Sequence, residues 1–394
     1  MRIRTAAGLV SCLLILCGAN DAHAQPLLTG YLQTVPLWSS TTPLSDSTAS
    51  NFNRFRLTTQ PTFGPFSFEA AYEHAATFRQ RTTMLGPGIG TVPSGGEYLE
   101  LQWTVTDEEH VLWRHRFDRL QVGWSPTRAF ELSAGRQTVS WGTTLFLTPA
   151  DPFIPFNPAD PFRQFRAGVD GARARIYPSP LSELDIVVRP TKTDVGEELT
   201  ALARGLTVWR NWELSGWAGS LYGDVAGAFG TAGALGVWAV RGEAVVRSIE
   251  DEVAVRGTVG VDRAFQVGGR DVFFLFEYQR DGFGATSPDA YLEVVVSDSF
   301  RRGEFQVIGR DETVVQVSYQ LHPLWSLAGL WLWNLNDRSA LLAPSFAYSA
   351  SNEASISGGV FFGFGNDEIS LARPLPSEYG VAGTTAYVSL SWFF

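Results

Sequence analysis

Apolar and polar residues alternate along most of the chain with a period of two, the pattern of a β-strand that has two different faces. Residues 312–321 show it most clearly: the odd positions from Val315 to Leu321 are apolar, while Gln316, Ser318 and Gln320 occupy the even positions. The windows 253–262, 272–280 and 354–364 repeat the alternation. No window of comparable length shows a 3.6-residue period, so the chain is predicted to be almost entirely β.

About 18 alternating segments can be counted, with about 16 to 20 as the accepted range, and their lengths suit tilted strands that cross a membrane. The predicted segments are residues 27–37, 52–60, 66–79, 97–106, 110–124, 129–141, 170–178, 182–190, 198–209, 212–223, 234–248, 252–265, 271–281, 310–322, 324–335, 340–350, 353–364 and 383–394. We therefore predict an all-β fold over residues 25–394, a transmembrane antiparallel β-barrel with one face toward lipid and a polar lumen.

The last segment is the most specific feature of the pattern. Val388, Leu390, Trp392 and Phe394 alternate with polar or aromatic residues, and the chain ends on Phe394. Bacterial outer-membrane barrels commonly end in such a strand, so Trp392 and Phe394 are predicted to form the signal that the barrel-assembly machinery reads. The 13 tryptophans suit aromatic girdles at the two membrane interfaces. The alternative, core tryptophans of a soluble β-sandwich, does not explain this terminus.

Residues 1–24 are predicted to be a cleaved secretory signal peptide. Arg2 and Arg4 precede a short apolar stretch, and residues 22–24 form an Ala-His-Ala cleavage site. A lipoprotein signal at Cys12 is the alternative, but that cysteine lies in the middle of the apolar stretch. Both cysteines lie in this leader, so the mature chain is expected to contain no disulfide. An exported chain with the alternation of a membrane barrel is expected to be located in the outer membrane.

Composition narrows the class of protein further. The net charge of −10 argues against nucleic acid as a partner, and all but one of the 30 basic residues are arginines. The 39 glycines and 21 prolines are scattered, which excludes fibrous and disordered classes. The mature chain has no apolar run of the ~20 residues that a membrane helix needs.

Residues 142–169 interrupt the alternation with an inserted segment rich in proline and phenylalanine. Five prolines between positions 149 and 161 prevent a strand ladder. The interleaved phenylalanines, among them Phe153, Phe156 and Phe162, would be costly to leave in water. We predict that this segment lies inside the lumen as a constriction or partial plug; a loop packed on the barrel rim is the alternative.

The direction of the strands gives a further prediction. With both termini periplasmic, the count places residues 38–51, 80–96, 282–309 and 365–382 outside, where long loops are expected. The same count places residues 142–169 on the periplasmic side, where turns are short. Either a hairpin upstream is miscounted, or a periplasmic connection folds into the pore.

Arginine recurs at positions that face away from the apolar side of each strand. Because arginine on the lipid face costs about 2–4 kcal/mol near the bilayer midplane, these side chains are predicted to line the lumen. They are Arg54, Arg56, Arg114, Arg116, Arg136, Arg173, Arg175, Arg241 and Arg256. An arginine surplus at the constriction would favour anionic or hydroxyl-rich solutes. The alternative is a lattice of salt bridges with the inward acids Asp118, Glu243, Asp262 and Glu277 that has no role in selectivity.

Two blocks of residues resemble a group of uncharacterised outer-membrane porin-like barrels. The first comprises Gly135-Arg136-Gln137, Trp141-Gly142, Pro149, Asp151, Phe156-Asn157-Pro158 and Gly168–Arg173; the second comprises Asn334–Ser339, Pro344 and Tyr348-Ser349. The group is similar in architecture to alginate-export-type barrels, and the resemblance covers roughly residues 110–394. It implies passage of anionic or polar solutes across the outer membrane. Where the pattern has glycine, this chain has Arg338.

The predicted function is that of a porin-like channel for passive or facilitated passage of small polar solutes, anionic ones included, or of a polymer. One alternative is a structural or adhesive barrel with a blocked lumen; another is an outer-membrane hydrolase. The histidines outside the leader, His74, His110, His115 and His322, show no catalytic pairing or metal-ligand spacing, so we expect no enzyme activity, cofactor or metal. The expected partners are outer-membrane lipid, the assembly machinery and the solute. Whether the barrel works alone or as a homo-oligomer stays open.

Overall fold

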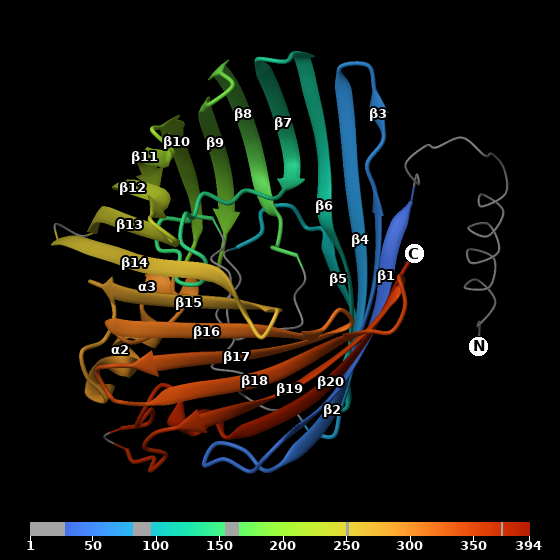
Figure 1. Cartoon of the computed structure of the whole chain (residues 1–394), viewed down its shortest axis with the longest axis vertical. Coiled ribbons are helices and arrows are strands. Elements are labelled where there is room, and N and C mark those ends of the chain that lie inside the picture. Colours follow the sequence, from blue (N-terminus) through green and yellow to red (C-terminus); the bar gives the residue numbers. More distant parts are fainter. Residues whose placement is uncertain (1–27, 82–95, 154–164, 250–251, 372) are drawn as a thin grey trace, which may run out of the picture.

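The computed structural model describes residues 28–81, 96–153, 165–249, 252–371 and 373–394. Within these residues the strands form one antiparallel sheet that closes on itself, because β1 pairs with both β2 and β20. The short β3 and β5 are accessory to this wall, which leaves a closed barrel of 18 strands (Figure 1). The predicted all-β, antiparallel barrel is therefore confirmed.

The strands of the wall are β1 (Thr29–Ser39), β2 (Thr48–Thr59), β4 (Phe66–Arg79), β6 (Val111–Thr127), β7 (Phe130–Gln137), β8 (Val169–Ser179), β9 (Ser182–Lys192), β10 (Glu197–Trp209), β11 (Trp212–Leu221), β12 (Asp224–Leu235), β13 (Trp238–Ile249), β14 (Glu252–Val267), β15 (Arg270–Asp281), β16 (Asp311–His322), β17 (Trp325–Asn334), β18 (Ala340–Ser349), β19 (Ala354–Phe364) and β20 (Thr384–Phe393). The accessory strands are β3 (Thr62–Phe63) and β5 (Gln102–Asp107), and the short helices are η1 (Pro288–Ala290), α2 (Tyr291–Val296), α3 (Asp298–Arg301) and η2 (Gly380–Ala382). Among the described residues, no helix combines the length and apolarity needed to cross a membrane.

The period-two pattern places apolar side chains outside the wall and polar side chains inside it. On β20, Leu390 and Trp392 are exposed on the outer face, whereas Ser389 is buried on the inner face. On β14, Val253 and Val259 are likewise exposed. An apolar outer band around a polar interior is what the hydrocarbon layer requires of a spanning barrel.

The long connections all lie at one end of the barrel, here called the long-loop end, and include the loop 282–310 and the segment between β7 and β8. Tight turns lie at the opposite, short-turn end, as in the turn between Trp209 and Trp212. There Arg210 and Asn211 have φ of 49° and 67°, the conformation that two-residue hairpins favour.

The predicted strand count contains two errors that cancel in number. The predicted strand 97–106 is not a separate member of the wall: β5 and β7 pair with successive parts of the same edge of β6. A strand at residues 224–235, β12, was missing from the prediction because its alternating glycines and alanines give little contrast between faces. The two errors inverted the expected direction of the intervening strands, so β7 ends and β8 begins at the same end of the barrel as the connections 40–47 and 282–310. Of the two explanations left open above, the structure supports the miscount upstream.

The chain ends within the seam that closes the barrel. Phe394 N–H donates to the carbonyl of Gly30 at 3.0 Å, and Gly30 N–H donates to the carbonyl of Phe394 at 2.8 Å. The Phe394 ring stacks on Phe55 with ring centroids 6.2 Å apart. The terminal aromatic thus joins the last strand to the first two.

Candidate functional site

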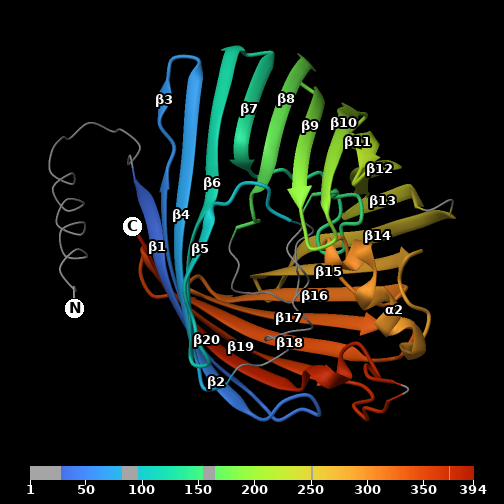
Figure 2. The same cartoon turned by 180° about the vertical axis from the view of Figure 1, so that it is seen from behind.

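The first part of the inserted segment, residues 142–153, crosses the inside of the barrel and packs on the inner wall from β9 to β18. Figures 1 and 2 show this stretch inside the ring of strands from both sides. Its prolines remove backbone donors, and its path forms no ladder with a strand, so the remaining N–H groups need side-chain acceptors.

Two glutamates of the wall supply those acceptors. Glu243 on β13 accepts hydrogen bonds from the N–H groups of Thr143, Thr144 (2.7 Å) and Ala150 (2.9 Å). Glu277 on β15 accepts from three consecutive N–H groups, those of residues 145, 146 and 147, at 2.7, 3.1 and 2.8 Å. Both carboxylates are buried, and each compensates its lost hydration with three charge-assisted bonds.

The underside of the segment is apolar. Phe153 packs edge-on against Trp141, with ring centroids 4.8 Å apart, and both rings are buried. Trp217 of β11 joins them, and its Nε1–H donates to the carbonyl of Ala150 at 2.8 Å. Leu147 occupies a second cluster against β16, β17 and β18. The segment is thus held by apolar packing and by the two glutamates together.

Of the three phenylalanines predicted to form a constriction, Phe153, Phe156 and Phe162, only Phe153 lies within the described residues. Phe153 is buried beneath the segment and does not face open lumen. Phe156 and Phe162 lie outside the described residues. Phe165, which follows them, stacks on Tyr31 of β1 at 6.1 Å and lies under the guanidinium of Arg56 at 4.6 Å. The described flanks at Phe153 and Phe165 therefore contact opposite parts of the wall.

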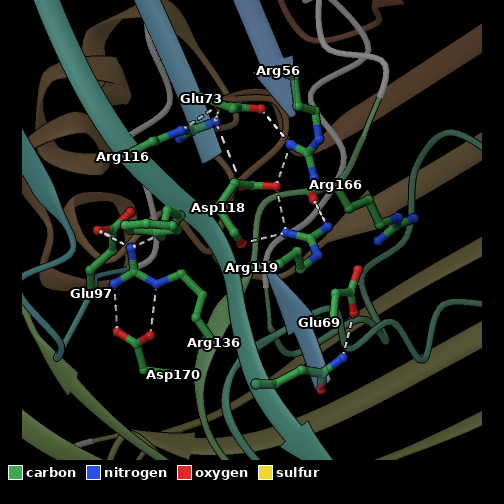
Figure 3. A network of polar contacts seen from close by, with 12 residues as sticks. Arg56, Glu69, Glu73, Glu97, Arg116, Asp118, Arg119, Arg136, Arg166 and Asp170 are labelled. Carbon is green, nitrogen blue, oxygen red and sulfur yellow. Dashed lines mark hydrogen bonds and ion pairs between the residues drawn. The ribbon is translucent and has the colours of Figure 1, made fainter. Parts of the chain in front are cut away.

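Near Phe165, the inner face of β2, β4 and β6 carries a dense charged cluster, drawn in Figure 3. Arg56 pairs with Glu73 and Asp118 at 2.5 and 2.8 Å, and Arg116 pairs with Glu73 at 2.5 Å. Arg119 pairs with Asp118 at 2.7 Å and also donates to the carbonyl of Arg166 in the inserted segment. Three guanidinium groups thus share two carboxylates, which leaves an excess of positive charge.

A cavity of ≈ 170 Å³ opens beside this cluster on the same face. Its charged lining residues are Arg54, Arg114, Arg116 and Glu73, three cations and one anion. Arg114 is exposed, and it forms none of the ion pairs found among the described residues. Three of the predicted lumen arginines, Arg54, Arg114 and Arg116, therefore lie together on the wall formed by β2, β4 and β6.

The Arg136 side chain does not line this cavity; it is buried among protein hydrogen-bond partners. Its buried guanidinium donates to both oxygens of Asp170 at 2.7 and 2.9 Å, pairs with Glu97 at 2.9 Å, and donates to the carbonyl of Leu99 at 2.7 Å (Figure 3). Asp170 in turn accepts the N–H groups of residues 98 and 99. This pair ties the chain before β5 to the inner wall.

The other predicted arginines also have carboxylate partners. Arg173 pairs with Asp185 at 2.6 Å, Arg175 pairs with Glu131, Arg241 pairs with Asp262 at 2.9 Å, and Arg256 pairs with Asp281 at 2.8 Å. Much of the predicted set therefore forms the lattice that was the alternative prediction, while Arg54 and Arg114 line the cavity.

Sequence reasoning missed a second charged cluster, which joins the loop 282–310 to the wall. Glu304 in this loop pairs with Arg247, and Arg302 pairs with Glu198. Burial raises the pKa of the Glu304 carboxyl, while the neighbouring arginines act in the opposite direction. Burial likewise raises the pKa of Asp151, which accepts from Ser140 Oγ at 2.8 Å. No local pattern marks Glu304, because its partners come from strands distant in sequence.

The described part of the chain contains no group of three or more His, Cys, Asp or Glu residues suited to a metal ion. Its polar interior residues are instead arranged as ion pairs and as acceptors of backbone N–H groups, which hold residues 142–153 in place.

Comparison with solved structures gives the fold class. The barrel superposes on OccAB1 of Acinetobacter baumannii with a TM-score of 0.55 and 11% identity, covering 96% of this chain and 99% of that one. A BenF-like porin from Pseudomonas fluorescens Pf-5 gives 0.54 and 11%, covering 93% and 98%. OpdK of Pseudomonas aeruginosa, solved with vanillate, gives 0.52 and 9%, also covering 93% and 98%.

No family model matches the chain, and no curated protein matches its sequence. The structural likeness covers nearly the whole length of each barrel, so the chain has the fold of an 18-stranded outer-membrane porin. At these identities the likeness defines the architecture and does not identify a solute.

Proposed function

We propose that the protein is an outer-membrane channel through which small polar solutes pass, with anions favoured over cations. The observation that carries this proposal is the cavity on the β2–β4–β6 wall, whose charged lining is three arginines and one glutamate. Residues 142–153 of the inserted segment lie against β9–β18, whereas Phe165 and Arg166 contact the basic wall itself.

Several further features belong to this proposal. Residues 1–24 act as a cleaved signal peptide, and Trp392 and Phe394 are read by the assembly machinery during insertion into the outer membrane. The channel carries out no covalent chemistry. Porins with this fold include one solved with vanillate, and the resemblance to alginate-export-type barrels adds polar polymers to the candidate solutes. A structural barrel with a closed lumen is the competing function, since the segment occupies part of the interior.

Planar-bilayer recordings in a salt gradient test the proposal. A monovalent anion about 5 Å from a guanidinium gains about 0.8 kcal/mol in a water-like dielectric, so each lining arginine changes anion occupancy about fourfold. We expect wild-type protein to show anion preference in its reversal potential, and Arg54→Gln with Arg114→Gln to reduce that preference. Arg128→Gln is the matched control, because Arg128 is exposed in the turn between β6 and β7.

Two results would contradict the proposal. Cation preference in the wild type would refute anion selectivity while leaving a channel. No conductance from correctly folded barrels, together with no solute uptake into liposomes, would favour the closed structural barrel.

A further inference from the structure

Two loops meet at a buried pair of glutamates at the long-loop end of the barrel. We call Glu312, near the start of β16, and Glu378, in the loop 365–383, the carboxyl pair. Both side chains are buried, and their carboxyl groups are in hydrogen-bond contact with each other. Two ionised carboxylates are acceptors only and repel each other, so this contact requires a proton on one of the two groups.

Glu378 joins the two loops through its carboxyl oxygens. One oxygen accepts from the N–H of Ile308 at 2.7 Å, and the other accepts from the N–H of Gly309 at 3.0 Å. The second oxygen also accepts from Asn334 Nδ2, at the end of β17, at 2.8 Å. A single side chain of the loop 365–383 therefore holds the last part of the loop 282–310 against the wall.

Glu312 has fewer partners than Glu378. Its Oε2 accepts from the hydroxyl of Tyr379 at 3.2 Å, while its Oε1 is buried and accepts from no N–H or hydroxyl group among the described residues. The other titratable groups that face the pair are Asp337 and the Tyr291 hydroxyl of α2, which donates to Asp337 at 2.6 Å. A proton shared with Glu378 therefore supplies the donor that Glu312 Oε1 otherwise lacks.

Arginine does not neutralise these acids. In the part of the chain that the structure describes, Glu312, Glu378 and Asp337 form no ion pair. The charged groups on adjacent elements have other partners: Arg256 pairs with Asp281 at 2.8 Å, Arg280 pairs with Asp311 at 2.7 Å, and Arg310 donates to the carbonyl of Gly284 at 3.2 Å. The carboxyl pair is therefore held together by a proton and not by a guanidinium group.

The docked position of the loops favours the protonated form. Burial raises the pKa of the Glu378 carboxyl above its ordinary value of 4.5, and the hydrogen bonds that it accepts act in the opposite direction. The docked loops therefore keep a proton that released, hydrated loops lose near pH 4.5. Docking is strongest in acid, and the ratio of docked to released loops falls by up to about tenfold for each pH unit between 4.5 and the raised pKa.

The loop 282–310 also reaches the inserted segment. Gln306 Nε2 donates to the carbonyl of Phe146 at 2.6 Å, and Gln306 Oε1 accepts from the N–H of Thr148 at 2.7 Å. Two residues earlier, Glu304 pairs with Arg247 of β13. Residues 304–309 thus connect the carboxyl pair to the inserted segment and the inner wall, so release at residues 308 and 309 loosens contacts inside the lumen.

We propose that the carboxyl pair is a proton-operated lock on the long-loop end. One shared proton holds the loop 282–310 against the loop 365–383. Loss of that proton leaves two like charges in contact, which separates the loops and loosens Gln306 from the inserted segment. Acid closes the lock and alkali opens it. The inference does not depend on whether the channel prefers anions or on which solute it carries.

Distances between the two loops test the lock. Leu292→Cys and Leu371→Cys, at exposed positions in the two loops, are made together in the full chain and spin-labelled, and the chain without these substitutions controls for the leader cysteines. We expect one narrow distance distribution at about pH 5 and a broad, released population that grows toward about pH 9, with the ratio of docked to released loops changing by up to about tenfold per pH unit.

Two variants of the labelled chain identify the carboxyl pair as the source of the pH dependence. Glu312→Gln places an amide NH2 beside Glu378 that donates without a titrating proton, so the loops should stay docked over the whole pH range. Glu368→Gln, exposed in the loop 365–383, is the matched control and should titrate as the wild type does. Heat-modifiable gel mobility establishes that each barrel is folded.

Three results would each overturn the proposal: wild-type loops whose distance distribution is the same at every pH, loops that separate in acid, and Glu312→Gln loops that titrate like the wild type. A barrel whose loops titrate as expected but that conducts no ions would support the lock while refuting the proposed channel. The two proposals can therefore fail separately.

Discussion

Removal of the Glu277 carboxylate should release the inserted segment from the wall. Glu277 is fully buried and accepts the N–H groups of residues 145, 146 and 147. Glu277→Ala leaves three backbone donors without acceptors, at roughly 1–3 kcal/mol each. We expect a loss near the lower end, about 3 kcal/mol in total, because water in the lumen can hydrate part of the exposed backbone.

That loss is large enough to change which state the segment occupies. A change of about 3 kcal/mol alters the ratio of docked to released segment by roughly 100-fold. Glu277→Gln should have a smaller effect, since its amide oxygen still accepts from residues 146 and 147 while its NH2 faces the donor of residue 145. The ordered series wild type, Glu277→Gln, Glu277→Ala should therefore appear in any measure of segment release.

Single-channel recording is the assay for this series. A released segment should give larger conductance with more open-channel noise, in barrels that keep their heat-modifiable mobility. Glu213→Gln is the matched control, because it removes an inner-wall carboxyl of β11 for which no hydrogen bond or ion pair to residues 142–153 is found among the described residues. Unchanged conductance and noise in a folded Glu277→Ala barrel would refute the claim that this carboxylate fixes the inserted segment.

Three other predictions concern the barrel and its insert. Arg136→Leu leaves the buried Asp170 without its bidentate partner and should destabilise the barrel by about 3–5 kcal/mol. The heat-modifiable gel shift should then occur at a lower temperature, and an unchanged midpoint temperature of that shift would contradict this. Gly30→Val should reduce the yield of folded barrel, because an added Cβ would clash with the carbonyl of Arg56 and lie 2.7 Å from the Phe394 ring. A normal yield would show that the seam tolerates the side chain. Replacing residues 149–162 with a short flexible linker should give a wider and less selective pore, and an unchanged reversal potential and conductance would exclude this stretch from the constriction.

The architecture was largely predictable, and the physical reason is local. A strand between lipid and water must alternate, so its two faces can be read from its own residues, as at 312–321 and 383–394. The prediction missed the wall strand β12, because its glycines and alanines give no contrast between the two faces. It also counted residues 97–106 as a wall strand, because they alternate although only part of them forms the accessory β5. The left-handed φ of 62° at Arg338 matches the glycine expected there, a local constraint that a family pattern can indicate.

The sequence by itself determined that the chain alternates, that arginines such as Arg56 and Arg136 face inward, and that the proline-rich stretch 149–161 cannot join the sheet. Each of these follows from the chemistry of one residue and its near neighbours. Only the tertiary structure decided which carboxylates pair with the arginines and which arginines line a cavity, because the partners of Arg136 and Arg56 lie on other strands. It alone also showed that Glu243 and Glu277 accept backbone N–H groups from the inserted segment, contacts that join residues about a hundred positions apart and exist only once the barrel has closed.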